Sequence, residues 1–222
     1  MLKFVTKAAP KAHTATVVFL HGLGDSGHGW APIADSLEKH LPHVKFIFPH
    51  APVQPVTLNY GMEMNSWYDI YSLKDRTKQD EKGVLESVDK IKKLLNEEIS
   101  SGISSDRIVL GGFSQGAAIS YTTGLSFESK LAGIVALSGY IPIDKKTMEL
   151  ATEINKSTKI FIGHGTSDTV VDYELGVESA EELKKMSYNV EFNSYEGLDH
   201  SSCLQELSDL TRFLTSVIPE TK

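Results

Sequence analysis

The sequence predicts an α/β protein with a mostly parallel central sheet, and three observations support this fold class. Short runs rich in β-branched and other apolar residues recur along the chain of 222 residues. Longer segments with helical periodicity separate most of them, as crossover connections between parallel strands require. The run at 132–137 is apolar throughout, which is typical of a strand buried on both faces of a parallel sheet.

No internal repeat, linker or low-complexity tract interrupts this alternation. We therefore expect residues 1–222 to form a single domain. A chain of this length buries roughly 70% of its unfolded surface, which is ample for one large core. The strand candidates, in chain order, are 16–20, 44–48, 107–112, 132–138, 159–163 and 189–195.

Three segments carry a strong helical pattern. The first, 83–99, places Val84, Val88, Ile91, Leu95 and Ile99 on one stripe, with Gly102 just past its end. The second is 174–186. The third is 202–217, where the spacing of Ser202 and Gln205 predicts a capping box at the start of the helix.

A G-x-S-x-G pentapeptide, Gly112 to Gly116, follows the strand candidate 107–112 and precedes a helix-forming run. In a nucleophile elbow the serine sits on a strained turn between strand and helix, and glycines let the two elements cross closely. This context predicts an α/β-hydrolase with Ser114 as the nucleophile.

An activated serine needs a base and an acid that orients it, and in α/β-hydrolases these follow in the order Ser, Asp or Glu, His. His200 lies after the strand 189–195 and just before the last helix. Asp168 lies on the loop after the strand 159–163. We therefore predict Asp168 as the acid and His200 as the base.

Three rivals to these assignments remain. His164 would need an acid from residues that do not directly follow a strand, so we expect it to brace the loop that carries the acid. Asp172 lies on the same loop. Asp199 is adjacent to His200 and cannot easily reach round to its imidazole.

The segment Phe19 to Gly27 follows the first strand candidate and is rich in glycine. An oxyanion hole in this fold takes one backbone N–H from such a loop and one from the residue after the nucleophile. These are Leu23 and Gln115. The spacing Gly22, Gly24, Gly27 also fits a dinucleotide fingerprint, but the next strand ends without the acidic residue that a nicotinamide site needs.

Seven motifs together resemble the acyl-protein thioesterases, in the small phospholipase/carboxylesterase branch of the α/β-hydrolases. The resemblance runs from about residue 15 to about residue 217. The motifs are His21-Gly-Leu-Gly-Asp25, Pro49-His-Ala-Pro52, Ser66-Trp-Tyr-Asp-Ile70, Gly111-Gly-Phe-Ser-Gln-Gly-Ala117, Ala136-Leu-Ser-Gly139, His164-Gly165 with Asp168, and His200-Ser-Ser202.

The resemblance implies hydrolysis of the thioester between a fatty acyl chain and a protein cysteine, as in palmitoylated proteins, with side activity on lysophospholipids and small esters. It implies the same roles for Ser114, Asp168, His200, Leu23 and Gln115. The family's acid loop usually reads Asp-Pro and later Val-Pro, whereas this chain has Thr169 and Asp172 there. A general carboxylesterase or lysophospholipase is the alternative enzyme, and a catalytically silent lipid carrier is the alternative outside enzymes.

The least regular stretch is 51–73, and a loop this long in a compact domain is usually a lid or a binding segment. The resemblance implies that it covers the active site and lines an acyl channel. We expect Trp67, Ile70 and Leu73 to contact substrate there, with core packing as an equal alternative for Trp67.

Whole-chain properties narrow the partners. The formal net charge of −7 and the lack of a long basic run argue against nucleic acid. The single cysteine, Cys203, excludes an intrachain disulfide and is expected to be a buried small residue. With neither a signal-like start nor a long apolar run, we expect a cytoplasmic protein, also present in the nucleus, that touches membrane surfaces only transiently. We expect no metal and no cofactor; acyl-chain preference and oligomeric state are left open.

Overall fold

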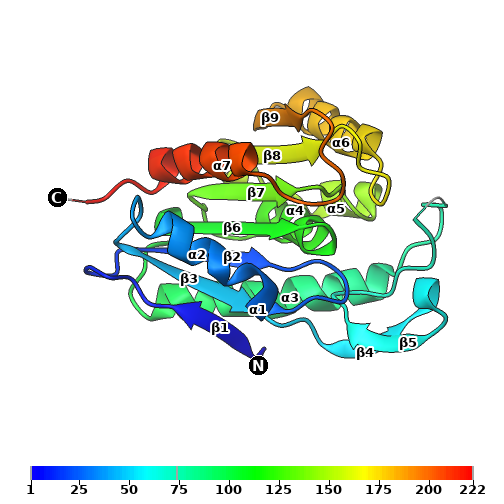
Figure 1. Cartoon of the computed structure of the whole chain (residues 1–222), viewed down its shortest axis with the longest axis horizontal. Coiled ribbons are helices and arrows are strands. Elements are labelled where there is room, and N and C mark those ends of the chain that lie inside the picture. Colours follow the sequence, from blue (N-terminus) through cyan, green and yellow to red (C-terminus); the bar gives the residue numbers. More distant parts are fainter. Residues whose placement is uncertain (1, 74, 222) are drawn as a thin grey trace.

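The computed structural model describes residues 2–73 and 75–221 and contains a seven-stranded sheet (Figure 1). The strands follow the order β1-β3-β2-β6-β7-β8-β9, and β1 alone runs antiparallel to its neighbour. Their bounds are β1 Phe4–Lys7, β2 Ala15–Leu20, β3 Val44–Pro49, β6 Ile108–Phe113, β7 Gly133–Leu137, β8 Lys159–Gly165 and β9 Asn189–Tyr195.

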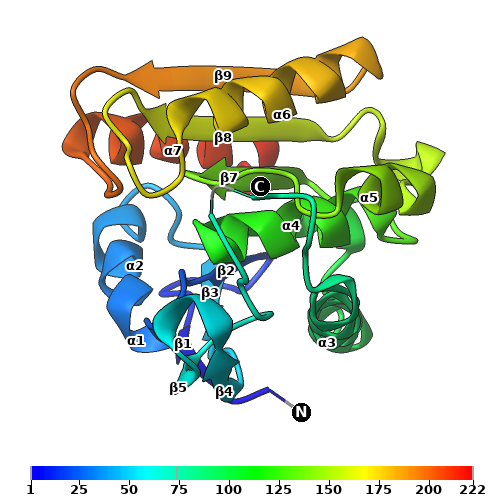
Figure 2. The ribbon, with the colours of Figure 1, turned by 90° about the vertical axis from the view of Figure 1, so that its right-hand side faces the viewer.

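Successive residues of a strand point to opposite faces of the sheet. Because both faces carry apolar side chains here, helices cover both of them. Val18 and Leu20 of β2 join the core under α3 (Glu81–Ser100), α4 (Gln115–Ser126) and α6 (Tyr173–Lys185). Val17 and Phe19 join the core under α2 (Pro32–Leu37) and α7 (Leu204–Val217). The short helix α1 (Gly27–Trp30) lies beside α2, and α5 (Asp144–Leu150) lies beside α4 (Figure 2).

The central helix, α4, has no exposed residue: every position from Gln115 to Ser126 is buried. It lies between the sheet and α3, and it contacts α5 at its side. The nucleophile candidate directly precedes this helix. The core therefore fixes the position of the helix that begins at the active site.

All six predicted strands and all three predicted helices are present, with ends within three residues of the expected ones. Strand β1 was not predicted, because Phe4 to Lys7 is a short edge strand with mostly exposed side chains. Within the described residues, no helix is both long and apolar enough to cross a membrane.

The expectation that 51–73 is irregular was wrong in part. This segment contains a two-stranded antiparallel hairpin, β4 (Val53–Val56) and β5 (Met62–Asn65), joined through a 3-10 turn at Thr57–Asn59. Pro55 in β4 and the mixed sequence of β5 conceal the strand pattern, because neither strand alternates polar with apolar residues cleanly.

The predicted capping box at Ser202 and Gln205 was also wrong. Helix α7 begins at Leu204, and its N-cap is Cys203, whose Sγ accepts a hydrogen bond from the Glu206 N–H at 3.5 Å. Cys203 is half-buried rather than buried. Ser201 and Ser202 still belong to the loop that carries His200, so the helix starts later than the serine pattern predicts.

Candidate active site

The nucleophile elbow forms where predicted, between β6 and α4. Ser114 has φ 55° and ψ −120°, a conformation that costs backbone energy in a residue other than glycine. Its N–H donates to the carbonyl oxygen of Leu137 in the neighbouring strand at 2.8 Å. This bond holds the strained turn, so that the side chain stands at the carboxyl edge of the sheet.

The two glycines of the elbow have no room for a side chain. A Cβ on Gly116 would lie 2.3 Å from the carbonyl oxygen of Leu20, and a Cβ on Gly112 would lie 2.4 Å from the backbone of Gly116. These contacts show why β2, β6 and α4 approach so closely at this point.

The three predicted triad residues come together at this edge. The Ser114 Oγ lies 2.9 Å from His200 Nε2, and His200 Nδ1 lies 2.7 Å from Asp168 Oδ2. Asp168 follows β8 and His200 follows β9, the next strand of the sheet. The arrangement suits transfer of the serine proton to the imidazole.

The carboxylate of Asp168 is buried and fully engaged. Its Oδ1 accepts the backbone N–H groups of Val170 and Val171, each at 2.9 Å. Burial opposes ionisation, but hydrogen bonds from His164, His200 and the Val171 N–H outweigh it and hold the pKa of Asp168 well below its usual range. The carboxylate therefore stays charged and can stabilise a positive imidazole.

The rival residues take other places. His164 is fully buried, with Nε2 2.9 Å from the carbonyl oxygen of Val171 and 3.4 Å from Asp168 Oδ2, so it braces the acid loop as expected. Asp172 and Asp199 are exposed. Within the part of the chain that the structure describes, neither carboxylate forms a hydrogen bond or an ion pair with His200.

Leu23 and Gln115 both line the cleft beside Ser114. Gln115 is the first residue of α4, so its N–H has no partner within the helix. Among the described residues, the Leu23 N–H makes no hydrogen bond to the protein either. Both amides are thus available to an oxyanion.

The loop that carries Leu23 is held by His21, which the sequence analysis did not assign a role. His21 Nε2 accepts the N–H of Ala51 at 3.0 Å, and Nδ1 lies 2.7 Å from the carbonyl oxygen of Gly22. The ring is neutral with its proton on Nδ1, because one nitrogen must accept and the other donate. Burial lowers its pKa, which favours this form.

A cleft of about 340 Å³ opens in front of Ser114, and its walls are mainly apolar. Of the predicted substrate contacts, Ile70 and Leu73 line it. Leu58 and Tyr68 also line it, and both lie in the segment 51–73 that was predicted to line an acyl channel. Wall residues that were not predicted are Trp30, Phe113, Tyr140, Val170 and Val171. Phe113 lies inside the pentapeptide, and Val170 and Val171 lie on the predicted acid loop.

Trp67 does not line the cleft and belongs to the core. Its side chain is 1% exposed, and its Nε1 donates to the carbonyl oxygen of His21 at 2.8 Å. A buried indole N–H needs a hydrogen-bond acceptor, and the His21 carbonyl oxygen supplies it. Of the two expectations for Trp67, core packing is therefore the one that is confirmed.

The side chain of Gln115 fastens the cleft wall to the elbow. Its Oε1 accepts the Trp67 N–H at 2.9 Å, and its Nε2 donates to the Tyr68 carbonyl oxygen at 2.7 Å and to Ser66 Oγ at 3.0 Å. One buried amide therefore joins the residue after the nucleophile to the segment that lines the cleft.

Comparison with known proteins places these features in a wider group. Residues 2–218 match the family model described as phospholipase/carboxylesterase. The chain is 48% identical to acyl-protein thioesterase 1 of Neurospora crassa over 217 residues, covering 94% of this chain and 89% of that protein. It is 48% identical to acyl-protein thioesterase 1 of Yarrowia lipolytica over 219 residues, covering 96% of each. The crystal structure of acyl-protein thioesterase 2 from Zea mays superimposes with a TM-score of 0.88 at 29% identity, covering 98% of this chain and 100% of that one.

Proposed function

Because this chain belongs to the phospholipase/carboxylesterase family of α/β-hydrolases, we propose that it is an acyl-protein thioesterase. Its substrates are proteins that carry a fatty acyl chain on a cysteine, such as palmitoylated proteins. The observation that carries the proposal is the Ser114, His200, Asp168 hydrogen-bond chain at the mouth of an apolar cleft.

The reaction has two steps. In the first, Ser114 Oγ attacks the thioester carbonyl carbon while His200 Nε2 takes the hydroxyl proton, and Asp168 stabilises the imidazolium. The N–H groups of Leu23 and Gln115 donate to the carbonyl oxygen as it becomes negative. His200 then returns the proton to the leaving sulfur, the C–S bond breaks, and the acyl chain stays on Ser114.

In the second step water replaces the thiol. His200 takes a proton from the water as its oxygen attacks the acyl-serine, and the same two amides hold the oxyanion. The C–O bond to Ser114 then breaks, the serine regains its proton, and a fatty acid leaves. No cofactor takes part in either step.

The cleft supports a long apolar acyl group as the recognised part of the substrate. Ile70, Leu73 and Leu58 offer alkyl surface, and each buried methylene contributes about 0.8 kcal/mol.

The test compares substrates on one purified preparation. We expect release of hexadecanoate from an S-palmitoylated peptide, and covalent labelling of Ser114 by a fluorophosphonate. Release from the oxygen-ester analogue of the peptide and from a lysophospholipid should be slower. A protein that hydrolyses p-nitrophenyl acetate and lysophospholipid but leaves the peptide intact is a carboxylesterase or lysophospholipase instead. A protein that binds acyl chains without reacting with the fluorophosphonate is a lipid carrier.

A further inference from the structure

A second hollow, separate from the catalytic cleft, lies between the start of the chain, helix α3 and the β4–β5 hairpin. Its volume is about 560 Å³, larger than the catalytic cleft and within the range of small-molecule sites. None of its lining residues lines the catalytic cleft. We call this hollow the α3 pocket.

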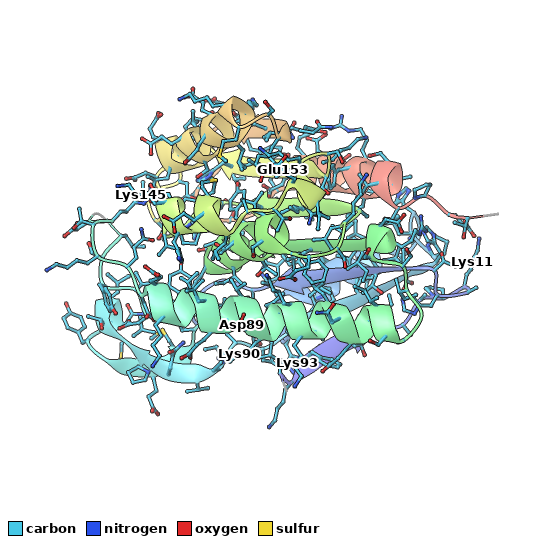
Figure 3. All side chains as sticks on the ribbon, turned by 180° about the vertical axis from the view of Figure 1, so that it is seen from behind. Lys11, Asp89, Lys90, Lys93, Lys145 and Glu153 are labelled. Atoms are coloured by element: carbon cyan, nitrogen blue, oxygen red, sulfur yellow. The ribbon has the colours of Figure 1, made fainter. Side chains whose placement is uncertain are left out.

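The walls of the α3 pocket combine apolar surface with positive charge. Apolar surface comes from residues that include Val53 and Leu94, and the cations are Lys3, Lys90 and Lys93. Figure 3 shows Lys90 and Lys93 along the edge of α3 that faces β1 and the hairpin. Within residues 2–73 and 75–221, none of the three lysines forms an ion pair.

The charge of the α3 pocket lining is opposite in sign to the net charge of the whole chain. The protein carries a formal net charge of −7, yet the lining of the α3 pocket has three lysines against one carboxylate, Glu97. Because unpaired lysines gather round an apolar hollow, the complementary ligand has an anionic head and an apolar tail.

The pocket is also preformed, because its inner wall is hydrogen-bonded to the loop that carries Leu23. His50 Nδ1 accepts the N–H of Gly27 at 3.1 Å, and Asn65 Nδ2 donates to the carbonyl oxygen of Asp25 at 2.7 Å. The Gly24 N–H donates to the Asn65 carbonyl oxygen at 2.9 Å. A ligand therefore does not have to order these walls when it binds.

His50 adds a neutral donor beside the lysines. Since its Nδ1 accepts a hydrogen bond, the neutral ring holds its proton on Nε2. Burial, followed by the neighbouring His28 and Lys3, lowers the pKa of His50 and favours this neutral ring.

We propose that the α3 pocket binds one long-chain fatty acid, with its carboxylate at Lys3, Lys90 and Lys93 and its alkyl chain along Val53 and Leu94. The choice of a fatty acid rests on the proposed function, which releases this compound as product. The chemistry of the pocket, a single-chain anionic amphiphile, does not depend on that choice. The pocket is thus proposed as a second binding site for the product.

The test must separate this pocket from the catalytic cleft. Wild-type protein is first reacted at Ser114 with a hexadecyl fluorophosphonate, so that an alkyl chain occupies the cleft. Binding of radiolabelled hexadecanoate below its aggregation concentration is then measured by equilibrium dialysis. We expect about one equivalent bound, and a melting temperature that rises with fatty acid concentration.

Matched variants locate the bound molecule. Lys90→Glu combined with Lys93→Glu should weaken binding by about tenfold or more, because two attractive charges become repulsive. The control is Lys145→Glu, an exposed lysine at α5, outside the α3 pocket (Figure 3); it should change binding less than twofold. Dodecanoate should bind more weakly than hexadecanoate, and hexadecanol more weakly than hexadecanoate.

Three results would overturn the proposal. The first is no binding to the blocked protein. The second is an equal loss of binding in the double variant and the control. The third is binding only to anionic phospholipid vesicles, which would make this surface a membrane contact. If the protein does not react with the fluorophosphonate, that result contradicts the proposed function but not the α3 pocket. The number of hexadecanoate molecules bound by Ser114→Ala, whose catalytic cleft is not blocked, then shows whether one pocket or two bind the fatty acid.

Discussion

The two sides of the catalytic cleft are held by different kinds of contact. On the triad side, Ser114, Asp168 and His200 follow β6, β8 and β9, so the backbone ladder of the sheet fixes their spacing. On the opposite side, residues 66–70 belong to no strand and are held by single hydrogen bonds. The Ser66 N–H donates to the Pro52 carbonyl oxygen at 2.9 Å, and the Leu58 N–H donates to the Ile70 carbonyl oxygen at 2.8 Å. Gln115 binds the backbone of 67 and 68, and Asp80 accepts the Asp69 N–H at 2.9 Å.

This difference predicts two separable kinds of variant. Changes on the triad side should remove the chemistry for every substrate, whatever its chain length. Changes on the opposite side should alter how strongly the rate depends on the acyl chain and should leave the chemistry in place. The predictions below test this separation, beginning with the largest effect on turnover.

The largest loss is expected for Ser114→Ala. Turnover should fall on the order of 10⁵-fold for long and short substrates alike, because the attacking oxygen is gone. The comparison of hexadecanoyl and acetyl thioesters measures whether the loss is uniform. The melting temperature serves as the control, and it should not fall, since alanine keeps the backbone of the elbow. Residual turnover above one part in a hundred would remove Ser114 from the mechanism.

Asp168→Asn should lower kcat by about 10⁴-fold, because the amide can stabilise the wrong imidazole tautomer. The matched control is Asp172→Asn, four residues further along the same loop, and it should retain turnover within about twofold. Steady-state kinetics of both variants show which of the two carboxylates is needed for turnover. The opposite order would move the acid to Asp172.

On the other side of the cleft, Gln115→Met keeps the volume and the backbone N–H of residue 115 but removes the side-chain amide. We expect kcat/KM for a hexadecanoyl thioester to fall about tenfold, and kcat/KM for an acetyl thioester to stay within about twofold of the wild-type value. The cause is the loss of three hydrogen bonds to Ser66, Trp67 and Tyr68. Equal losses for both substrates would mean that Gln115 acts on the chemistry and not on the wall.

A smaller effect is expected for Leu73→Asn, in the same wall. The gain in kcat/KM per added methylene, at most about fourfold when the group is fully buried, should become shallower. Acetyl substrates should react as before. If the slope of rate against chain length does not change, then Leu73 does not contact the acyl chain.

The least effect on turnover, and the clearest effect on stability, is expected for Glu206→Gln on the triad side. Glu206 lies in α7 with both carboxylate oxygens buried and without a hydrogen-bond partner in the described part of the chain. It is close to Gly163 of β8 and Tyr195 of β9. Burial, with a smaller contribution from Asp209, raises its pKa to about 8.

The sign of the pH effect follows from that pKa. The folded state keeps the proton up to about pH 8, whereas the unfolded chain loses it near 4.5. Wild-type stability should therefore fall by a few kcal/mol between these two pH values, at about 1.36 kcal/mol per pH unit. Denaturant unfolding at pH 5 and pH 8.5 should show a smaller fall in Glu206→Gln. Parallel curves for the two proteins would mean that Glu206 is already ionised at neutral pH.

The same difference between the two sides explains what the sequence could predict. The positions of Ser114, Asp168 and His200 each follow a strand, so chain order and motif context were enough to bring them together. Gly112 and Gly116 could be assigned to the elbow from the pentapeptide. The structure gives the reason, because backbone atoms leave no space for a Cβ at either position. The roles of these residues in catalysis, and the cytoplasmic location, stay predictions.

The walls of the cleft were harder to predict because they depend on side-chain geometry. Tyr140 and Val170 lie next to predicted motifs, but the sequence does not show that their side chains face the cleft. Trp67 was expected either in the core or in the cleft, and its burial with an N–H acceptor places it in the core. The first residue of α7 depends on the length of the loop that carries His200, and local helix propensity does not predict that length.

The fully buried helix α4 also affects how the amount of native protein in a sample can be measured. Apart from the N–H of Gln115, which faces the cleft, its amide hydrogens lie in a helix packed between the sheet and α3, so we expect their deuterium exchange to report global unfolding. Ser114, on its strained turn, directly precedes this helix. If the proposed function is correct, we expect a fluorophosphonate probe to label only molecules in which this helix is in place, so that the labelled fraction measures the amount of native protein.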